Sequence, residues 1–332
     1  MNITFTQASG LQDSVFGKYQ NPIISFLERR GEEFEQTSLI KEMFCMKTSD
    51  TFGGTFTGMT AMESFEPVGE LGAAPFTGFQ EGYQKFIGQM TWRNAFAVSM
   101  EMVEDSILMN LSSYPEAFMT AYQRGREQFG AALYGGALQG NQQIQFGGRA
   151  FDVTVADGMP LFDTAHPAKV SGPDQSNRFS NPFSASVLGE LETRMQQFRG
   201  DNGELLDVAP DTIVIPNIAS LKNDVFAAIG ADREPVSANN AFNYQYGRWN
   251  IIIWNYLRDY IPAGDEPWIL LDSKFNDLYN GAVWIDRVQL KIDSTIDYNT
   301  MANVWYGRSR FNAGFNDWRF AAVGGVTGGD TL

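Results

Sequence analysis

The stretch PEAFMTAYQRGREQFGAALYGGAL, residues 115–138, decides the fold prediction. Its apolar residues recur at i, i+3 and i+4, which predicts an amphipathic helix of about six turns. Pro115 suits the first turn, where its missing amide hydrogen would have no helical acceptor. Gly135 and Gly136 are expected to end the helix. The apolar positions are Phe118, Ala121, Tyr122, Phe129, Ala132 and Leu133.

The segments before this helix lack a compact pattern. Residues 1–36 are expected to form an extended arm, with a short helical piece at Pro22–Arg30, that needs another surface to lie on. Residues 48–89 are rich in glycine, and a structureless loop of that length is uncommon, so we predict a long β-hairpin with arms at 51–62 and 83–97. A two-stranded ribbon is marginally stable alone, so this one should pack against a neighbour. A further helix is predicted from Ser99.

The segments after the long helix alternate between helical and strand patterns. Residues 139–183 are predicted to be loop-like, with short strands within 141–158. A compact α/β unit follows, and from Ala282 onward a period of two predicts strands that include Trp318 and Phe320. Residues 324–332 are expected to be a flexible end. The helices of the α/β unit are 184–198 and 217–229, and its strands are 212–215, 251–254 and 268–271.

Composition excludes several classes of protein. Of the 332 residues, 43% are hydrophobic, enough for a sizeable core, and only 19% are charged, which indicates that much of the surface contacts protein. The net charge of −15 disfavours a nucleic-acid-binding protein, because such binding relies on Lys and Arg. A single cysteine excludes an intrachain disulfide. With no secretion signal or long apolar segment, we expect a soluble cytoplasmic protein without membrane contact.

The only histidine offers the strongest candidate for catalysis. His166 lies in the sequence FDTAHP, where Asp163 and a hydroxyl such as Ser171 could complete a catalytic triad. The alternative is a polar loop histidine beside Pro167, which we favour. A lone histidine also excludes most metal sites, which draw on several His or Cys ligands.

Other chemical motifs favour structural roles. Phosphate-binding P-loop and nucleophile-elbow motifs are absent. Three acids near Ser99 could bind a cation, but acids in the first turn of a helix explain them more simply. Cys45 has apolar neighbours and is expected to be buried. An aromatic cluster could stack bases or sugars, but packing in the core or between subunits is favoured. The acids are Glu101, Glu104 and Asp105, and the cluster is Tyr244, Tyr246, Trp249, Trp254 and Tyr256. We therefore predict no catalytic, cofactor-binding or metal-binding residues, and no enzyme.

The order of arm, glycine-rich ribbon, long helix, α/β unit and returning strands resembles the major capsid protein of tailed phages, with the HK97-like fold. The phrase ALYGGALQG at 132–140 looks like the end of the spine helix of that fold. FDTAHP at 162–167 and DTIVIPNIASLKNDVFAAIG at 211–230 are similar to segments of Mu-like major head subunits. GAVWIDRVQLKIDS, from 281, matches the strands that return to the peripheral sheet.

The resemblance implies an α+β fold in five parts. These are an N-terminal arm (1–47), an extended β-hairpin loop (48–97), a peripheral domain with the spine helix (98–183), an axial α/β domain (184–280), and peripheral return strands with the C-terminus (281–332). The family's namesake is crosslinked between lysine and asparagine. Lys85 lies near the loop, but no residue here identifies that chemistry, so it is not carried over.

The function implied by the resemblance is a structural one. The chain would self-assemble into hexamers and pentamers of an icosahedral shell around double-stranded DNA, which its negative charge would repel from the wall. Expected partners are a portal, a scaffolding protein that is separate because the arm starts near Met1, and a possible decoration protein. The chain would reside in the virion after assembly in the host cytoplasm. The alternatives are an encapsulin-type compartment shell and a hydrolase that uses His166.

Overall fold

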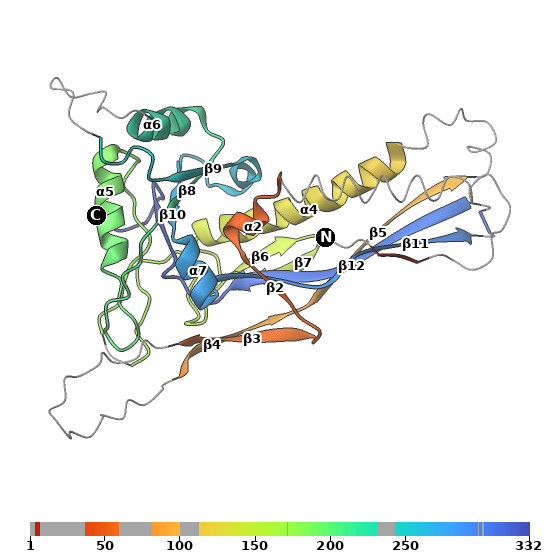
Figure 1. The fold of residues 1–332 in the computed structure, drawn as a ribbon, viewed down its shortest axis with the longest axis horizontal. Helices are drawn as coiled ribbons and strands as arrows, with labels where there is room; N and C mark the ends of the chain where they lie inside the picture. Colours follow the sequence, from red (N-terminus) through yellow and green to blue (C-terminus); the bar gives the residue numbers. More distant parts are fainter. Residues whose placement is uncertain are drawn as a thin grey trace.

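The structure is a computed structural model that describes residues 4–6, 37–59, 81–99, 113–170, 172–230, 243–297, 299–300 and 302–332. Two sheets share one hydrophobic core, and a long helix lies against the first sheet (Figure 1). The molecule is elongated along this helix and the two longest strands. The predicted mixture of helices and strands is confirmed.

The first sheet is built on an antiparallel pair of long strands, β11 (Ala282–Asp297) and β12 (Ala302–Phe315). Strand β5 (Met90–Ser99) pairs with β12 in antiparallel orientation. Strands β1 (Thr4–Thr6) and β2 (Cys45–Thr48) both pair with β11 in parallel. The sheet therefore joins segments from the beginning and the end of the sequence.

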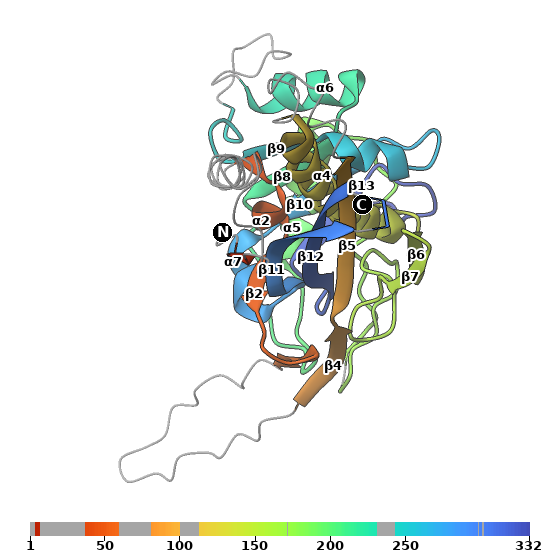
Figure 2. The same cartoon turned by 90° about the vertical axis from the view of Figure 1, so that its right-hand side faces the viewer.

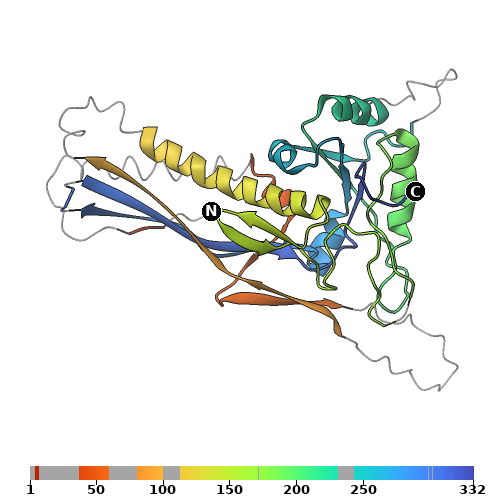
Figure 3. The same ribbon diagram turned by 180° about the vertical axis from the view of Figure 1, so that it is seen from behind.

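Helix α4 (Ser113–Leu138) lies along one face of this sheet (Figure 3). Its Phe129 ring contacts Trp92, Trp284 and Phe311, one ring from each of the three longest strands of the sheet. The predicted end of the helix at two glycines is wrong. The helix runs through both because they allow close packing: a Cβ at Gly135 would lie 2.1 Å from Cβ of Tyr260, and one at Gly136 would lie 2.1 Å from Cγ2 of Ile144.

The second sheet has the order β13 (Ala321–Gly324), β10 (Trp268–Leu271), β8 (Thr212–Pro216) and β9 (Asn250–Trp254). Strands β8 and β9 are parallel, and the other pairs are antiparallel. The surrounding helices are α5 (Ala185–Gln196), α6 (Ala219–Ile229), the 3₁₀ helix η1 (Asn255–Tyr260) and α7 (Ser273–Tyr279). Ser184 and Asp272 cap α5 and α7 by accepting hydrogen bonds from backbone amides. All elements predicted for residues 184–271 are present.

The end of the chain differs from its prediction. Residues 281–332 were expected to return together to the first sheet, but β13 leaves it and pairs with β10. Trp318 and Phe320 lie in the turn between the sheets rather than in a strand. The last residues are held in place: the Asp330 amide donates to the Arg178 carbonyl oxygen, and the Leu332 amide donates to Oδ1 of Asn181.

Two hairpins complete the fold, β3 (Gly53–Met59) with β4 (Glu81–Gly88), and β6 (Gln143–Phe146) with β7 (Arg149–Asp152). The first confirms the predicted ribbon but corrects its second arm. The chain changes partner at Gln89, so residues 90–97 belong to the first sheet. A short helix, α2 (Ile40–Met43), precedes β2. The helical piece at 22–30 and most of the helix predicted from Ser99 lie outside the described residues, and Ser99 itself ends β5.

Candidate interaction surfaces

The β3–β4 hairpin is anchored at its base and directed away from the body (Figure 2). Ile87 is buried against Val283 and Ile285 of β11. Nδ2 of Asn312 donates a hydrogen bond of 2.6 Å to the Gly88 carbonyl oxygen. This anchor fixes the direction in which the hairpin leaves the first sheet.

Two lysines, Lys85 and Lys169, also connect the hairpin to the body of the protein. Nζ of Lys85 lies 2.6 Å from Oδ2 of Asp152 and 2.6 Å from Oγ1 of Thr154. Burial raises the pKa of Asp152, but the hydrogen bonds from Lys85 and Thr154 outweigh it and lower this pKa below its ordinary value. Nζ of Lys169 donates to the Gly82 carbonyl oxygen at 2.7 Å and lies over the Tyr83 ring. Lys85 therefore links β4 to β7 within the same chain.

Two phenylalanines form an exposed apolar patch at the hairpin base. Phe52 is 64% exposed and Phe86 is 58% exposed. Gly53 and Gly88 face each other across the strands, and a Cβ at Gly53 would lie 2.5 Å from Cζ of Phe86. The Phe86 ring can therefore take this position only because residue 53 has no side chain. Exposed aromatic side chains of this kind mark protein–protein contacts.

The candidate catalytic histidine is buried within a network of hydrogen bonds. Nδ1 of His166 lies 2.8 Å from Oδ2 of Asp157, and Nε2 lies 3.2 Å from Oδ1 of Asn177. Its ring stacks on Trp318, with centroids 4.4 Å apart. Asp163, the predicted triad partner, instead accepts from the Ala165 amide, and Ser171 lies outside the described residues. Both ring nitrogens face acceptor oxygens, so neither is placed as a general base. His166 lies outside the named helices and strands, beside Pro167, and its side chain is buried by this network.

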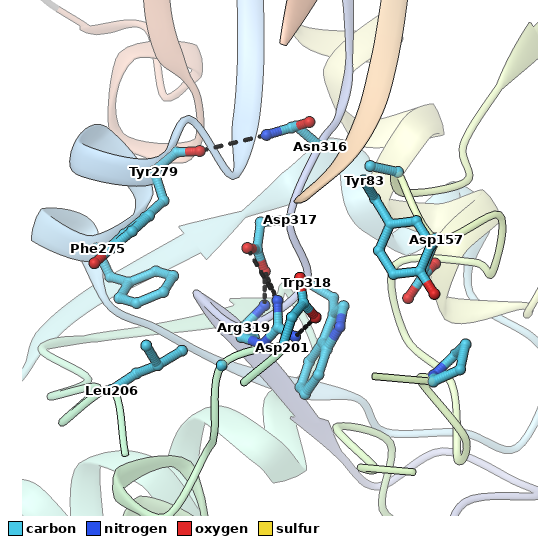
Figure 4. Close-up of a pocket in the computed structure, with 13 residues that line it drawn as sticks. Tyr83, Asp157, Asp201, Leu206, Phe275, Tyr279, Asn316, Asp317, Trp318 and Arg319 are labelled. Atoms are coloured by element: carbon cyan, nitrogen blue, oxygen red, sulfur yellow. Dashed lines mark hydrogen bonds and ion pairs between the residues drawn. The ribbon is translucent and has the colours of Figure 1, made fainter. Parts of the chain in front are cut away.

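The cavity beside this network is small and ionic (Figure 4). Arg319 pairs with Asp201 at 2.8 Å and with Asp317 at 3.3 Å. Burial lowers the pKa of Arg319, but the two carboxylates outweigh burial and raise it. The cavity volume is about 30 Å³, which suits one or two water molecules and no substrate. We infer that this network has a structural role: it holds Asp157, His166 and Asn177 against the turn that contains Trp318.

The remaining sequence candidates separate into core and surface. Cys45 is buried, as predicted, and burial raises the pKa of its thiol. The aromatic cluster divides: Trp249 and Trp254 belong to the core, whereas Tyr244 and Tyr246 are exposed. Tyr256 packs partly buried against the core. The acids Glu101, Glu104 and Asp105 lie outside the described residues.

The described residues contain neither a metal-binding cluster nor a membrane-crossing helix. No group of three or more His, Cys, Asp or Glu side chains there could hold a metal ion. None of the described helices is long and apolar enough to cross a membrane.

The sequence analysis missed the Phe52–Phe86 patch. Its signal was Phe52 directly before Gly53–Gly54 and Phe86 two residues before Gly88.

Comparison with known proteins relates the fold to capsids. No family model matches the chain, and no curated protein matches its sequence. The structure titled "Capsid structure of the Cyanophage P-SCSP1u" matches with a TM-score of 0.54 at 10% identity, covering 85% of this chain and 86% of that chain.

Two further solved structures match over almost the whole chain. "Capsid of empty GTA particle computed with C5 symmetry" has a TM-score of 0.52 at 12% identity, covering 100% of this chain and 95% of that chain. "Mycobacterium phage Patience" has a TM-score of 0.51 at 15% identity, covering 98% and 93%. The chain therefore shares the fold found in phage capsid structures, as the resemblance implied.

Proposed function

We propose that this chain is a major capsid protein, which self-assembles into hexamers and pentamers of an icosahedral shell enclosing double-stranded DNA. The observation that carries the proposal is the fold likeness to capsid structures, which extends over 85–100% of the chain. The role is structural rather than enzymatic, since the one histidine is committed to hydrogen bonds within the fold.

The architecture supports contacts between copies. A hairpin that leaves the body with exposed phenylalanines at its base can bury them only on another molecule. Head-to-tail contacts of this kind close into rings when the rotation between copies permits. Rings of five and six joined edge to edge would make a closed shell.

The proposed division into parts follows the HK97-like pattern. The arm is 1–47, the extended loop is 48–97, and α4 is the spine helix of a peripheral region at 98–183. The axial region is 184–280, and 281–332 contains the return strands. The pairing of β13 with β10 adds residues 321–324 to the sheet of the axial region. The likeness to Mu-like head subunits belongs to this proposal as well.

The proposed partners and location follow from the shell. A scaffolding protein, a portal and possibly a decoration protein would accompany the chain in a virion assembled in the host cytoplasm. DNA would be enclosed without specific binding, because a net charge of −15 repels it at long range.

The test is assembly of the purified chain, followed by electron microscopy and sedimentation. The intact chain is expected to form closed particles, whereas deletion of residues 55–84 leaves a soluble chain that does not assemble. A finer variant is Phe52→Ser with Phe86→Ser, and its control is Leu278→Ser, which removes an apolar side chain that is even more exposed, on α7. Normal particles from the deletion variant contradict the proposal. Native particles that hold an enzyme instead of DNA would indicate a compartment shell.

A further inference from the structure

A cavity of about 130 Å³ lies between α4 and the first sheet. It shares no lining residue with the small ionic cavity of Figure 4. The buried residues Phe118, Leu290 and Phe311 line its interior, whereas Arg93 and Asn94 at its rim are exposed. The cavity therefore opens to solvent beside β5, the strand at the edge of the sheet. We call it the α4–β5 pocket.

A glycine of α4 keeps this pocket open. Gly125 lines it, and no atom lies within 4 Å of a Cβ built at that position. Every other glycine of α4 is packed against a side chain from elsewhere in the chain. Glycine inside a helix is less favourable than alanine, because it costs more backbone entropy. The described residues give no packing reason for Gly125, so the space in front of it is free to hold something from outside the chain.

One polar side chain inside the pocket lacks a partner. Ser309 is 1% exposed and lies on the face of β12 that is turned towards α4, and no hydrogen bond joins its hydroxyl to a described residue. The other polar groups there are engaged. Arg126 donates to the Asp286 carboxylate and the Tyr122 hydroxyl, and Nε1 of Trp92 donates to a backbone carbonyl oxygen. Because an unpaired buried hydroxyl is costly, a ligand that bonds to Ser309 would gain affinity.

The walls of the pocket suit one uncharged aromatic ring. The Trp92 and Phe311 rings stack on each other, with centroids 4.9 Å apart, and α4 adds the rings of Phe118 and Tyr122. An apolar cavity of about 150 Å³ accommodates benzene, so a pocket of this size and lining can hold a single ring. The walls are apolar and the buried Arg126 is already paired, so a charged ligand would lose its hydration without compensation.

The surroundings of the pocket favour a small molecule over a protein side chain. Side chains that anchor a protein partner are surrounded by further contact area that excludes water. Of the exposed large hydrophobic side chains in the described part of the chain, none belongs to α4 or β5. Besides Arg93 and Asn94, the exposed residues around the opening include Ala121 and Arg124 of α4. The pocket is therefore an isolated apolar hole in a polar surface.

We propose that the α4–β5 pocket binds a small, neutral aromatic molecule that carries one hydroxyl group. The ring lies among the aromatic walls, and the hydroxyl forms a hydrogen bond with Ser309. This site does not depend on the proposed shell function. The ligand contacts both α4 and the first sheet, so it stabilises the folded chain once its concentration exceeds the dissociation constant.

The experiment compares phenol with toluene, which has a methyl group in place of the hydroxyl, on the purified full chain. Saturation-transfer NMR measures binding, and thermal melting measures stabilisation. Phenol is expected to bind with a dissociation constant on the order of 1 mM. Ser309→Ala should weaken phenol binding about tenfold, the effect of one hydrogen bond, without weakening toluene binding. Gly125→Leu fills the open space, so it should abolish binding of both probes and raise the melting temperature.

Arg124→Leu is the matched control, because it adds the same side chain at an exposed position of the same helix and should leave both affinities unchanged. Absence of saturable phenol binding would overturn the proposal, and so would binding that survives Gly125→Leu. Unchanged phenol affinity in Ser309→Ala would remove the recognition of a hydroxyl. If the unaltered chain binds neither probe and Gly125→Leu abolishes particle assembly, the pocket belongs instead to a side chain of a neighbouring copy.

Discussion

Replacing Arg126 by Ala tests the ion pair that fastens α4 to the first sheet. The Arg126 guanidinium lies 3.0 and 3.2 Å from the two carboxylate oxygens of Asp286 and 3.0 Å from the Tyr122 hydroxyl. It also lies over the Trp284 and Phe311 rings, at 4.9 and 5.0 Å from their centroids. Truncation would leave Asp286 as an uncompensated charge between helix and sheet.

The structure sets the size of the expected loss. Breaking a buried pair by removing one partner costs about 3–5 kcal/mol of unfolding free energy. The Asp286 side chain is 14% exposed and keeps one donor, Nε1 of Trp284 at 3.1 Å. We therefore expect a loss of about 3 kcal/mol, at the low end of that range. The double change Arg126→Met with Asp286→Asn removes both charges but keeps an acceptor for Trp284, and should cost about 1 kcal/mol.

The assay is urea unfolding of the unassembled chain, followed by tryptophan fluorescence. Arg124→Ala is the matched control, because it changes an exposed arginine on the same helix and should alter stability by less than about 0.5 kcal/mol. Equal stability of the Arg126→Ala and Arg124→Ala chains would refute the reasoning. A double change that costs as much as Arg126→Ala would assign the loss to packing rather than to charge.

Three further predictions test packing, pH dependence and thiol burial. Gly125→Ala should stabilise α4 by up to about 1 kcal/mol, because nothing lies within 4 Å of the new Cβ. Gly135→Ala should destabilise the protein, because its new Cβ would collide with Tyr260. A thermal melting temperature that is not higher for Gly125→Ala than for Gly135→Ala contradicts this account of the packing. The pair between Lys85 and Asp152, which lowers the pKa of that aspartate, contributes above the ordinary aspartate pKa of about 4 and is lost as the pH falls through the lowered value. Asp152→Asn should therefore speed amide exchange in β4 at pH 7 and have no effect near pH 2; an effect at both would indicate a contact that does not depend on charge. The buried thiol of Cys45, with its raised pKa, should react with iodoacetamide at least about a hundredfold more slowly in the folded chain than in urea, and equal rates would show that the site opens.

Elements with a strong local pattern were predictable from the sequence. The apolar spacing of residues 115–138 located α4, and buried runs such as 212–215 and 268–271 located β8 and β10. The end of α4 was not predictable, because Gly135 and Gly136 normally end helices. Here the partners that explain them, Tyr260 and Ile144, come from later in the chain.

Pairing between distant strands was the other limit. Residues 81–99 form two strands in immediate succession, and only their partners, β3 and β12, distinguish hairpin from sheet. His166 is buried against Trp318, about 150 residues later in the chain. The polar neighbours of His166 in the sequence do not indicate this burial.

The pairing of β5 with β12 has a consequence for synthesis. At about 5–20 residues per second, a ribosome completes β12 roughly 10 to 40 s after β5. Throughout that interval the side chains of β5 that contact α4, Trp92 and Phe96, lack their stacking partners Phe311 and Trp305. A polypeptide that ends before β12 cannot close this sheet, so β5 and α4 can pack as they do in the structure only after β12 has been synthesised.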